Sequence, residues 1–185
     1  IANEQRSERR YLADLTVRFK PYAVRALLRT ADIPFAESVS SPILVLPIFQ
    51  RGGITNLWDD PNPWRDAWHR FEAQERLVDL VVPIGELADL AAINSVQALN
   101  GDRAALRVFA GGHGADETLV TVAKLEFDPS GTPSVDVTAQ RYGSVVGPIR
   151  VERFTGSSDE GVEALLRTSV SEMAARIEYD WKLEN

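Results

Sequence analysis

Alternating and clustered apolar residues in the early part of the chain predict a strand, a helix and a second strand. Every second residue from Tyr11 to Phe19 is apolar, which is the period of a strand with one face in water. Apolar residues at helical spacing predict a helix over Pro21–Ala31. The run Ile43–Phe49 is apolar throughout and predicts a central strand buried on both faces, with Pro47 marking a bulge or the strand's end.

A tryptophan-rich segment lies between a predicted hairpin and a predicted helix. Gly52-Gly53 turns the chain into a short second arm, Ile54–Trp58. Asn62 and Pro63 are typical of a helix start, because the Asn side chain accepts from first-turn N–H groups and Pro suits the first helical position. We expect the apolar face of this helix to contain Trp64, Trp68 and Phe71, and its polar face Arg65, Asp66, Arg70 and Glu72.

The middle of the chain predicts one more buried strand and two short helices. Leu77–Ile84 repeats the pattern of a strand buried on both faces. Beyond Gly85, apolar spacing indicates one helix around residues 87–91 and another around 105–110, after the Asn100-Gly101 break. Gly111–Gly114 is expected to end the second helix.

The last third predicts three strands and a long helix. Thr118–Phe127, Ser134–Tyr142 and Ile149–Phe154 are expected to form an antiparallel meander. A capping-box pattern, Ser157–Glu160, precedes apolar residues at helical spacing over Val162–Trp181. The fold class is therefore α/β (α+β): a mixed sheet with helices on at least one face. We expect a flexible N-terminal segment, residues 1–10, followed by a single domain, residues 11–185.

Composition and charge exclude several classes of protein. The chain is 44% hydrophobic and 25% charged, as folded domains are, and its net charge of -7 leaves no basic face, so no nucleic-acid partner is expected. It has no cysteine, and no apolar run approaches the ~20 residues of a transmembrane helix. Because it opens on charged residues without an initiator Met, we expect a longer precursor, in which a signal or lipid anchor stays open.

Several stretches resemble one known bacterial family. The most specific is Trp58-Asp59-Asp60-Pro61-Asn62-Pro63-Trp64, which lies within Asn56–Trp68 and follows the apolar run Ile43–Phe49. Leu99–Leu106 and Gly114-Ala115-Asp116 fit as well. On these residues, the chain resembles the domain of unknown function DUF-2066 over most of its length.

A broader likeness is to the α/β domains of bacterial cell-envelope proteins such as the N-terminal domain of TolB and the curli-secretion lipoprotein CsgG. The order of elements from Val45–Phe49 to Gly114–Tyr142 is similar to theirs. This resemblance implies a periplasmic or outer-membrane-associated role in protein assembly, with another envelope protein as partner. It implies no catalytic residues.

The segment Gly111–Glu117 is the best candidate for chemistry. It places His113 close in sequence to Asp116 and Glu117, as an acid/base site requires. The same residues also make an ordinary turn from helix to strand, which we favour. A cleft near this turn, in a small-ligand-binding protein or a hydrolase, is therefore the alternative function.

No metal or cofactor is expected. Asp66, His69 and Glu72 lie at helical spacing, but no second His pair accompanies them, so a solvated helix face is favoured. Asp59 and Asp60 could bind a hard cation, although turn residues are the favoured interpretation. No phosphate loop and no nucleophile elbow is present.

The tryptophans leave two interpretations open. Trp64, Trp68 and Trp181 are expected to pack two helices onto the sheet, whereas Trp58 and the loop after it stay partly exposed as a recognition edge. Together with the turn, the candidate binding residues are Trp58, Asp59, Asp60, Asn62, Arg65, His113 and Asp116. The main hypothesis is a non-catalytic protein-interaction module of the bacterial envelope.

Overall fold

The computed structural model describes residues 3–6, 11–14, 30, 41–71, 78–143, 147–155 and 161–184. Its two compact units are Ile1–Phe35 and Ala36–Asn185. In the first unit, β1 (Asn3–Arg6) pairs antiparallel with β2 (Tyr11–Asp14). The expected division into residues 1–10 and 11–185 stays a prediction. The helix expected over residues 21–31 lies outside the described residues apart from Thr30, which is helical.

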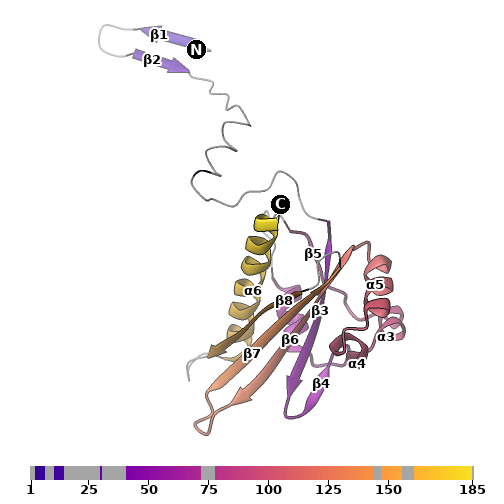
Figure 1. The fold of residues 1–185 in the computed structure, drawn as a ribbon. Helices are drawn as coiled ribbons and strands as arrows, with labels where there is room; N and C mark the ends of the chain where they lie inside the picture. The colour runs from indigo at the N-terminus through magenta and orange to yellow at the C-terminus, as the bar shows by residue number, and fades with distance from the viewer. Residues whose placement is uncertain are drawn as a thin grey trace. The chain divides into compact units, whose positions relative to one another are not determined.

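The second unit is built around a mixed sheet in the order β4-β3-β6-β7-β8, with β5 also paired to β3 (Figure 1). Its strands are β3 (Ile43–Arg51), β4 (Ile54–Asn56), β5 (Leu80–Val81), β6 (Glu117–Phe127), β7 (Pro133–Tyr142) and β8 (Gly147–Thr155). β3 runs parallel to β5 and β6, and the other pairs are antiparallel. The predicted mixed sheet with a C-terminal antiparallel meander is confirmed.

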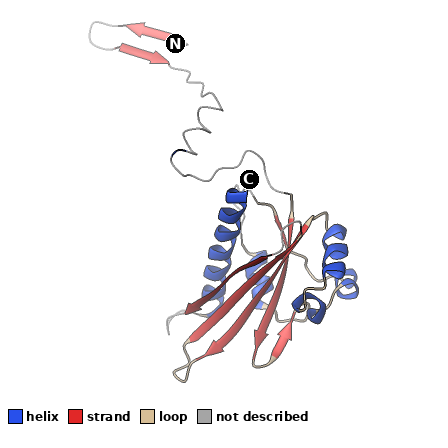
Figure 2. Cartoon of the chain, in the orientation of Figure 1, coloured by secondary structure: helices blue, strands red, loops and turns tan. Residues whose placement is uncertain are grey.

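Helices lie against both faces of this sheet (Figure 2). They are α2 (Pro63–His69), α3 (Leu87–Ala92), α4 (Ser95–Leu99), α5 (Arg103–Gly112) and α6 (Val162–Glu184). α2 and α6 contact each other on one face, and α3, α4 and α5 form a layer on the other. None of the helices in the described ranges is long and apolar enough to cross a bilayer.

β3 separates the two cores of this unit. Ile43, Val45 and Phe49 belong to the core under α2 and α6, whereas Leu44, Leu46 and Ile48 belong to the core under α3, α4 and α5. Successive side chains of a strand point to opposite faces, so a strand covered on both sides needs apolar residues at every position. The prediction of a central, doubly buried strand is confirmed.

Pro47 neither bulges nor ends β3, so the prediction made for it was wrong. β3 continues to Arg51, and its register with β6 is unbroken from Ile43 to Arg51. Pro47 lies between the residues that pair with β5 and those that pair with β4. Its carbonyl accepts from Asn62 Nδ2 at 3.0 Å. A proline is compatible with this position because its missing N–H faces the side where no described strand pairs.

The tryptophans of α2 and α6 fill the core between these helices and the sheet. Trp64 is fully buried, and its Nε1 donates to Thr121 Oγ1 on β6 at 3.0 Å. The Trp64 and Trp68 rings meet edge to face, with centroids 5.8 Å apart, and Trp181 joins the same core from α6. The prediction that these three rings pack two helices onto the sheet is confirmed.

Two elements between residues 78 and 100 differ from the sequence prediction. The strand expected over Leu77–Ile84 is only Leu80–Val81 within the described residues, because Pro83 offers no N–H to continue the pairing. Three helices, rather than two, lie between β5 and β6. The additional one is α4, whose Asn94 and Gln97 form a reciprocal capping box that the apolar spacing alone did not indicate.

The C-terminal helix and the meander have the predicted faces. The buried residues of α6 are Leu165, Leu166, Ser169, Val170, Met173, Ala174, Ile177 and Trp181. On β7, Val135, Val137 and Ala139 are buried and alternate with more exposed polar residues. The capping box expected at Ser157–Glu160 lies outside the described residues.

Replacing Trp64 tests whether this core holds α2 on the sheet. We expect Trp64→Ala to lower the free energy of unfolding by ~3 to 5 kcal/mol, because a large ring is removed from a site with no access to solvent. Trp64→Phe is the matched control: it keeps most of the apolar volume and loses the bond to Thr121. Urea denaturation measures both variants. A loss below ~1 kcal/mol in Trp64→Ala would contradict this packing.

Asp136 on β7 and Arg153 on β8 predict a pH dependence of stability. The hydrogen bond from Arg153 lowers the pKa of Asp136 below its ordinary value. The stabilisation that the Asp136–Arg153 pair gives the folded state is therefore complete above the ordinary carboxyl pKa of the unfolded chain. It is lost as the pH falls through the lower pKa of Asp136 in the folded state. We expect Asp136→Asn to cause a small loss at pH 7, and the difference from the parent to shrink as the protein is acidified below about pH 4.

Urea denaturation between pH 7 and pH 3 measures this difference. Glu172→Gln on α6 is the control, because Glu172 is an exposed carboxylate without an ion pair in the described part of the chain. A difference between Asp136→Asn and the parent that stays constant with pH would contradict the assignment.

Candidate functional site

Asn62 joins three segments of the chain. It is fully buried, and its Nδ2 donates to the carbonyls of Pro47 and Leu57, each at 3.0 Å, and of Asn56 at 3.3 Å. Its Oδ1 accepts from Arg65 N at 3.0 Å, which caps α2 as predicted. All polar atoms of this side chain are thus engaged within the protein. Of the candidate binding residues, Asn62 therefore has a visible structural role, and a binding role for it stays a prediction.

Arg65 is buried, in contrast to the polar, solvated position expected for it. Its guanidinium donates from Nη1 to the carbonyl of Trp58 at 2.9 Å and from Nη2 to Asp60 Oδ1 at 2.5 Å. A buried arginine is stable only when its donors are satisfied, and the loop before α2 supplies these acceptors. The expected polar face of α2 was wrong at this residue, because the loop folds back over it. Arg70 is exposed and pairs with Glu163, and Glu72 lies outside the described residues.

Trp58 is half-buried and contacts the layer of α3, α4 and α5. Its Nε1 donates to the carbonyl of Ile93 at 2.7 Å, and its ring lies 5.9 Å from that of Phe109. Gly85, at φ +86°, lies so close that an added Cβ would be 3.3 Å from the Trp58 ring. Asp59 and Asp60 beside it are exposed. Recognition of a partner by this loop stays a prediction.

His113 and Asp89 connect α5 to α3. His113 Nε2 lies 2.9 Å from Asp89 Oδ1, while Asp89 Oδ2 accepts from the backbone N–H groups of Gly85 and Glu86. Asp89 is buried, and the His113 ring also meets Phe109 edge to face at 4.8 Å. This pair holds two helices of the layer together. The predicted role of the Gly111–Gly114 turn in ending α5 is confirmed.

His113, Asp116 and Glu117 have different surroundings in the structure. Glu117 forms an ion pair with Arg141 on the neighbouring strand at 2.5 Å. Asp116 is exposed and lines a cleft, whereas His113 and Glu117 do not. His113 and Glu117 thus have different partners, Asp89 and Arg141, and an acid/base role for this segment stays a prediction.

The cleft that Asp116 lines has a volume of about 440 Å³. It lies between α5, the beginning of β6 and the end of β7. Its lining residues are Arg103, Leu106, Arg107, Ala110, Asp116, Thr118, Tyr142 and Gly143. Apart from Asp116, the sequence analysis did not single out these residues. One feature of the sequence could have indicated this cleft: Arg103 and Arg107 lie four residues apart on one helix, and neither has an acidic residue three or four positions away.

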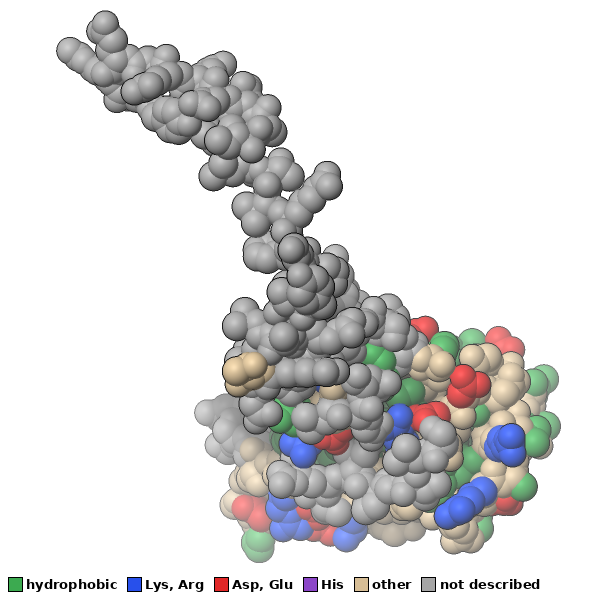
Figure 3. Space-filling model, turned by 45° about the horizontal axis from the view of Figure 1, so that its top comes forward, with side chains coloured by type: hydrophobic (Ala, Val, Ile, Leu, Met, Phe, Trp, Pro, Cys, Tyr) green, Lys and Arg blue, Asp and Glu red, His purple; other side chains and the backbone are tan. Residues whose placement is uncertain are grey.

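The α3, α4 and α5 layer exposes several large apolar side chains. Leu87 is 86% exposed and Val108 is 76% exposed. The other large apolar side chains that are exposed over residues 84–108 are Ile84, Leu90, Val96 and Leu99. The sequence pattern predicted a helix around residues 87–91 from this apolar spacing, but periodicity shows only that a helix has an apolar face, not what covers it. Figure 3 shows hydrophobic, basic and acidic side chains intermixed over the visible described surface.

Within the described residues, no group of three or more His, Cys, Asp or Glu side chains is arranged to hold a metal ion. Asp59 and Asp60, the pair considered for a hard cation, are adjacent and exposed, and Asp60 pairs with Arg65. His69 is exposed at the end of α2, while Asp66 is half-buried beside α6.

Asn62 and Asn94 allow a matched test of the loop before α2. Both side chains cap a helix, but only Asn62 is buried and also bonds to carbonyls of other segments. We expect Asn62→Ala to lower the free energy of unfolding by ~2 to 4 kcal/mol, and Asn94→Ala by only ~1 kcal/mol. Urea denaturation measures both. Equal losses would show that Asn62 acts only as a helix cap.

No protein-family model and no curated protein sequence matches the chain. Solved structures similar to the chain include three bacterial ones. The hypothetical protein CT253 from Chlamydia trachomatis is 11% identical and has a TM-score of 0.46, with 79% of this chain and 100% of that chain covered. Lipoprotein GNA1162 from Neisseria meningitidis is 17% identical, with coverage of 75% and 98% and a TM-score of 0.40. The LpoB C-terminal domain from Salmonella enterica is 14% identical, with coverage of 73% and 93% and a TM-score of 0.35. Membership of DUF-2066 and the likeness to TolB and CsgG stay predictions.

Proposed function

We propose that this chain is a protein-interaction domain of the bacterial cell envelope, and that it binds its partner through the outer side of α3, α4 and α5. The envelope location rests on the sequence resemblance to TolB and CsgG. Membership of DUF-2066 is proposed from the segment Asn56–Trp68 on the same basis. One structural observation supports the binding surface: large apolar side chains are exposed on these three helices.

The exposed apolar side chains are unevenly distributed over the described residues. Ile84, Leu87, Leu90, Val96, Leu99 and Val108 come from one short part of the chain, whereas Ile54, Phe127 and Tyr179 come from three separate places. Single exposed apolar residues are ordinary, but a concentration of them on one layer is typical of an interaction surface. Burying a leucine side chain contributes roughly 1.5 to 3 kcal/mol, so a few such contacts can stabilise a complex.

The helices that carry these side chains are fixed to the sheet, to the loop before α2 and to each other. Trp58 bonds to the carbonyl of Ile93, which follows α3. His113 pairs with Asp89, which joins α5 to α3. Leu106 and Phe109 of α5 are buried against the sheet. A partner therefore meets helices that are already ordered, which lowers the entropic cost of association.

The exposed loop before α2 is proposed as the polar border of this surface. Asp59 and Asp60 follow Trp58, whose ring contacts the layer through Phe109. Interfaces combine an apolar centre with a polar rim, and exposed carboxylates suit the rim. In this proposal, the apolar side chains provide the affinity and the two carboxylates contribute to partner choice.

Photo-crosslinking in bacterial cells tests the surface. A photoreactive amino acid replaces Leu87 or Val96 in one pair of variants, and exposed Glu172 on α6 in the control. We expect a discrete crosslinked product from positions 87 and 96, identified by mass spectrometry as an envelope protein. A second substitution, Leu90→Glu, should reduce the yield at least about tenfold, because a charge then has to be buried at the contact.

Two outcomes would contradict the proposal. Equal crosslinking from residue 172 and residue 87 would show that contact is nonspecific. The absence of a discrete product from positions 87 and 96, or a product whose yield is unchanged by Leu90→Glu, would show that these apolar side chains do not carry the binding. Circular dichroism and thermal unfolding of each variant establish that the exposed substitutions leave the fold intact.

A further inference from the structure

The cleft between α5, the beginning of β6 and the end of β7 contains two arginines that have no partner among the described residues. Arg103 and Arg107 lie one helical turn apart on α5 and both line the cleft. Neither has a hydrogen bond or an ion pair with any described residue. Asp102, immediately before Arg103, instead accepts from Ala105 N and caps the helix. Two guanidinium groups thus face one concavity with their donors available.

The nearby carboxylates do not neutralise these arginines. Glu117 lies against Gly143 at the edge of the cleft, but its carboxylate pairs with Arg141 at 2.5 Å. Asp116 is the one carboxylate among the lining residues, and it forms no ion pair with another described residue. The cleft therefore has an excess of positive charge in a protein whose net charge is -7. A local excess of positive charge attracts anions even though the net charge of the protein is negative.

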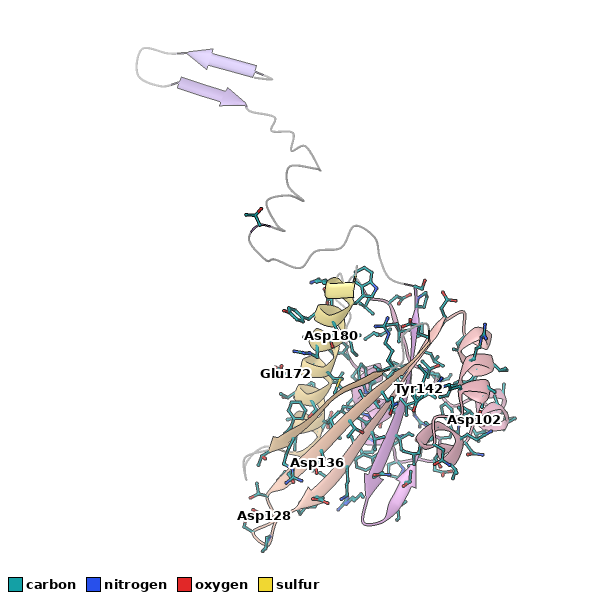
Figure 4. The ribbon with its side chains drawn as sticks, viewed as in Figure 1. Asp102, Asp128, Asp136, Tyr142, Glu172 and Asp180 are labelled. Carbon is teal, nitrogen blue, oxygen red and sulfur yellow. The ribbon has the colours of Figure 1, made fainter. Side chains whose placement is uncertain are left out.

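Tyr142 supplies a third donor to the same space. It lies at the end of β7, on the side of the sheet next to α5 (Figure 4). Its hydroxyl has no hydrogen-bond partner among the described residues, although its ring packs against the core under α5. Gly101, at φ +65°, lies against it: an added Cβ would be 2.4 Å from the hydroxyl oxygen. The turn between α4 and α5 therefore fixes the position of the ring.

We infer that this cleft binds a small organic acid, with its carboxylate or phosphate group held by Arg103, Arg107 and the Tyr142 hydroxyl. Guanidinium groups and a phenol are the donors that proteins use for such oxyanions. Leu106 and Ala110 provide an apolar floor, and Asp116 accepts from a hydroxyl or amino group of the same ligand. A volume of about 440 Å³ lies in the range of small-molecule sites. This site is separate from the proposed protein-binding function.

A titration followed by nitrogen-15 NMR tests the inference. Inorganic phosphate and citrate are the probes, added at constant ionic strength with chloride as the balancing ion. We expect saturable shifts of the backbone amides of α5 and of residues at the end of β7. The probe that binds more tightly identifies the preferred acid group.

Matched variants separate the cleft from general charge effects. Arg103→Gln with Arg107→Gln should weaken binding at least about tenfold, because two charged hydrogen bonds are lost. The control variant, Arg70→Gln with Arg167→Gln, removes two positive charges beside α2 and α6. It should bind phosphate and citrate as tightly as the parent protein does. Tyr142→Phe keeps the ring, loses the hydroxyl and should weaken binding at least about threefold.

Three results would overturn the inference. They are the absence of saturable shifts with either probe, an equal weakening in both double variants, and shifts spread over the whole spectrum. The spectra themselves show whether each variant is folded. The crosslinking test uses residues of α3 and α4, which do not line the cleft. A negative NMR titration therefore leaves the proposed protein-binding function untouched, and a negative crosslinking result leaves the anion site untouched.

Discussion

The burial of β3 on both faces is the constraint on which the rest of the second unit depends. Its side chains enter two different cores, so a helical layer is required on each side of the sheet. Trp64 and Trp68 of α2 cover one side together with α6, and the shorter helices α3, α4 and α5 cover the other. β6 runs parallel to β3 and extends both cores toward the meander. Without either layer, alternate residues of the same strand would be left in water.

The loop from Leu57 to Asn62 connects these two layers at one end of the sheet. Leu57 and Trp58 contact the core under α3, α4 and α5, while Asn62 begins the helix on the opposite side. Buried hydrogen bonds from Asn62 and Arg65 hold the loop between them. Buried backbone carbonyls need hydrogen-bond donors, and in this loop the Asn62 amide and the Arg65 guanidinium provide them for Leu57 and Trp58. The tryptophan-rich motif is therefore first a structural junction.

The layer of α3, α4 and α5 has different properties on its two sides. Its inner side is apolar and is fixed to the sheet by Phe109 and Leu106. Its outer side exposes apolar residues such as Leu87, which is the basis of the proposed partner surface. Between α5, the beginning of β6 and the end of β7 lies the cleft that Arg103 and Arg107 line. Short helices on a rigid sheet can thus offer a contact surface and a small-molecule site without sharing residues between them.

The sequence by itself determined the elements whose patterns reflect local geometry or complete burial. Apolar runs identified β3, helical spacing and the Asn62-Pro63 start identified α2, and alternation identified the faces of β7. Tertiary structure decided what covers each apolar face. It buried Arg65 under a loop, left Leu87 in solvent, and sent Glu117 to Arg141 rather than toward His113. Periodicity records which residues share a face, whereas burial and pairing depend on which distant segment lies against that face, and this is set only when the chain folds.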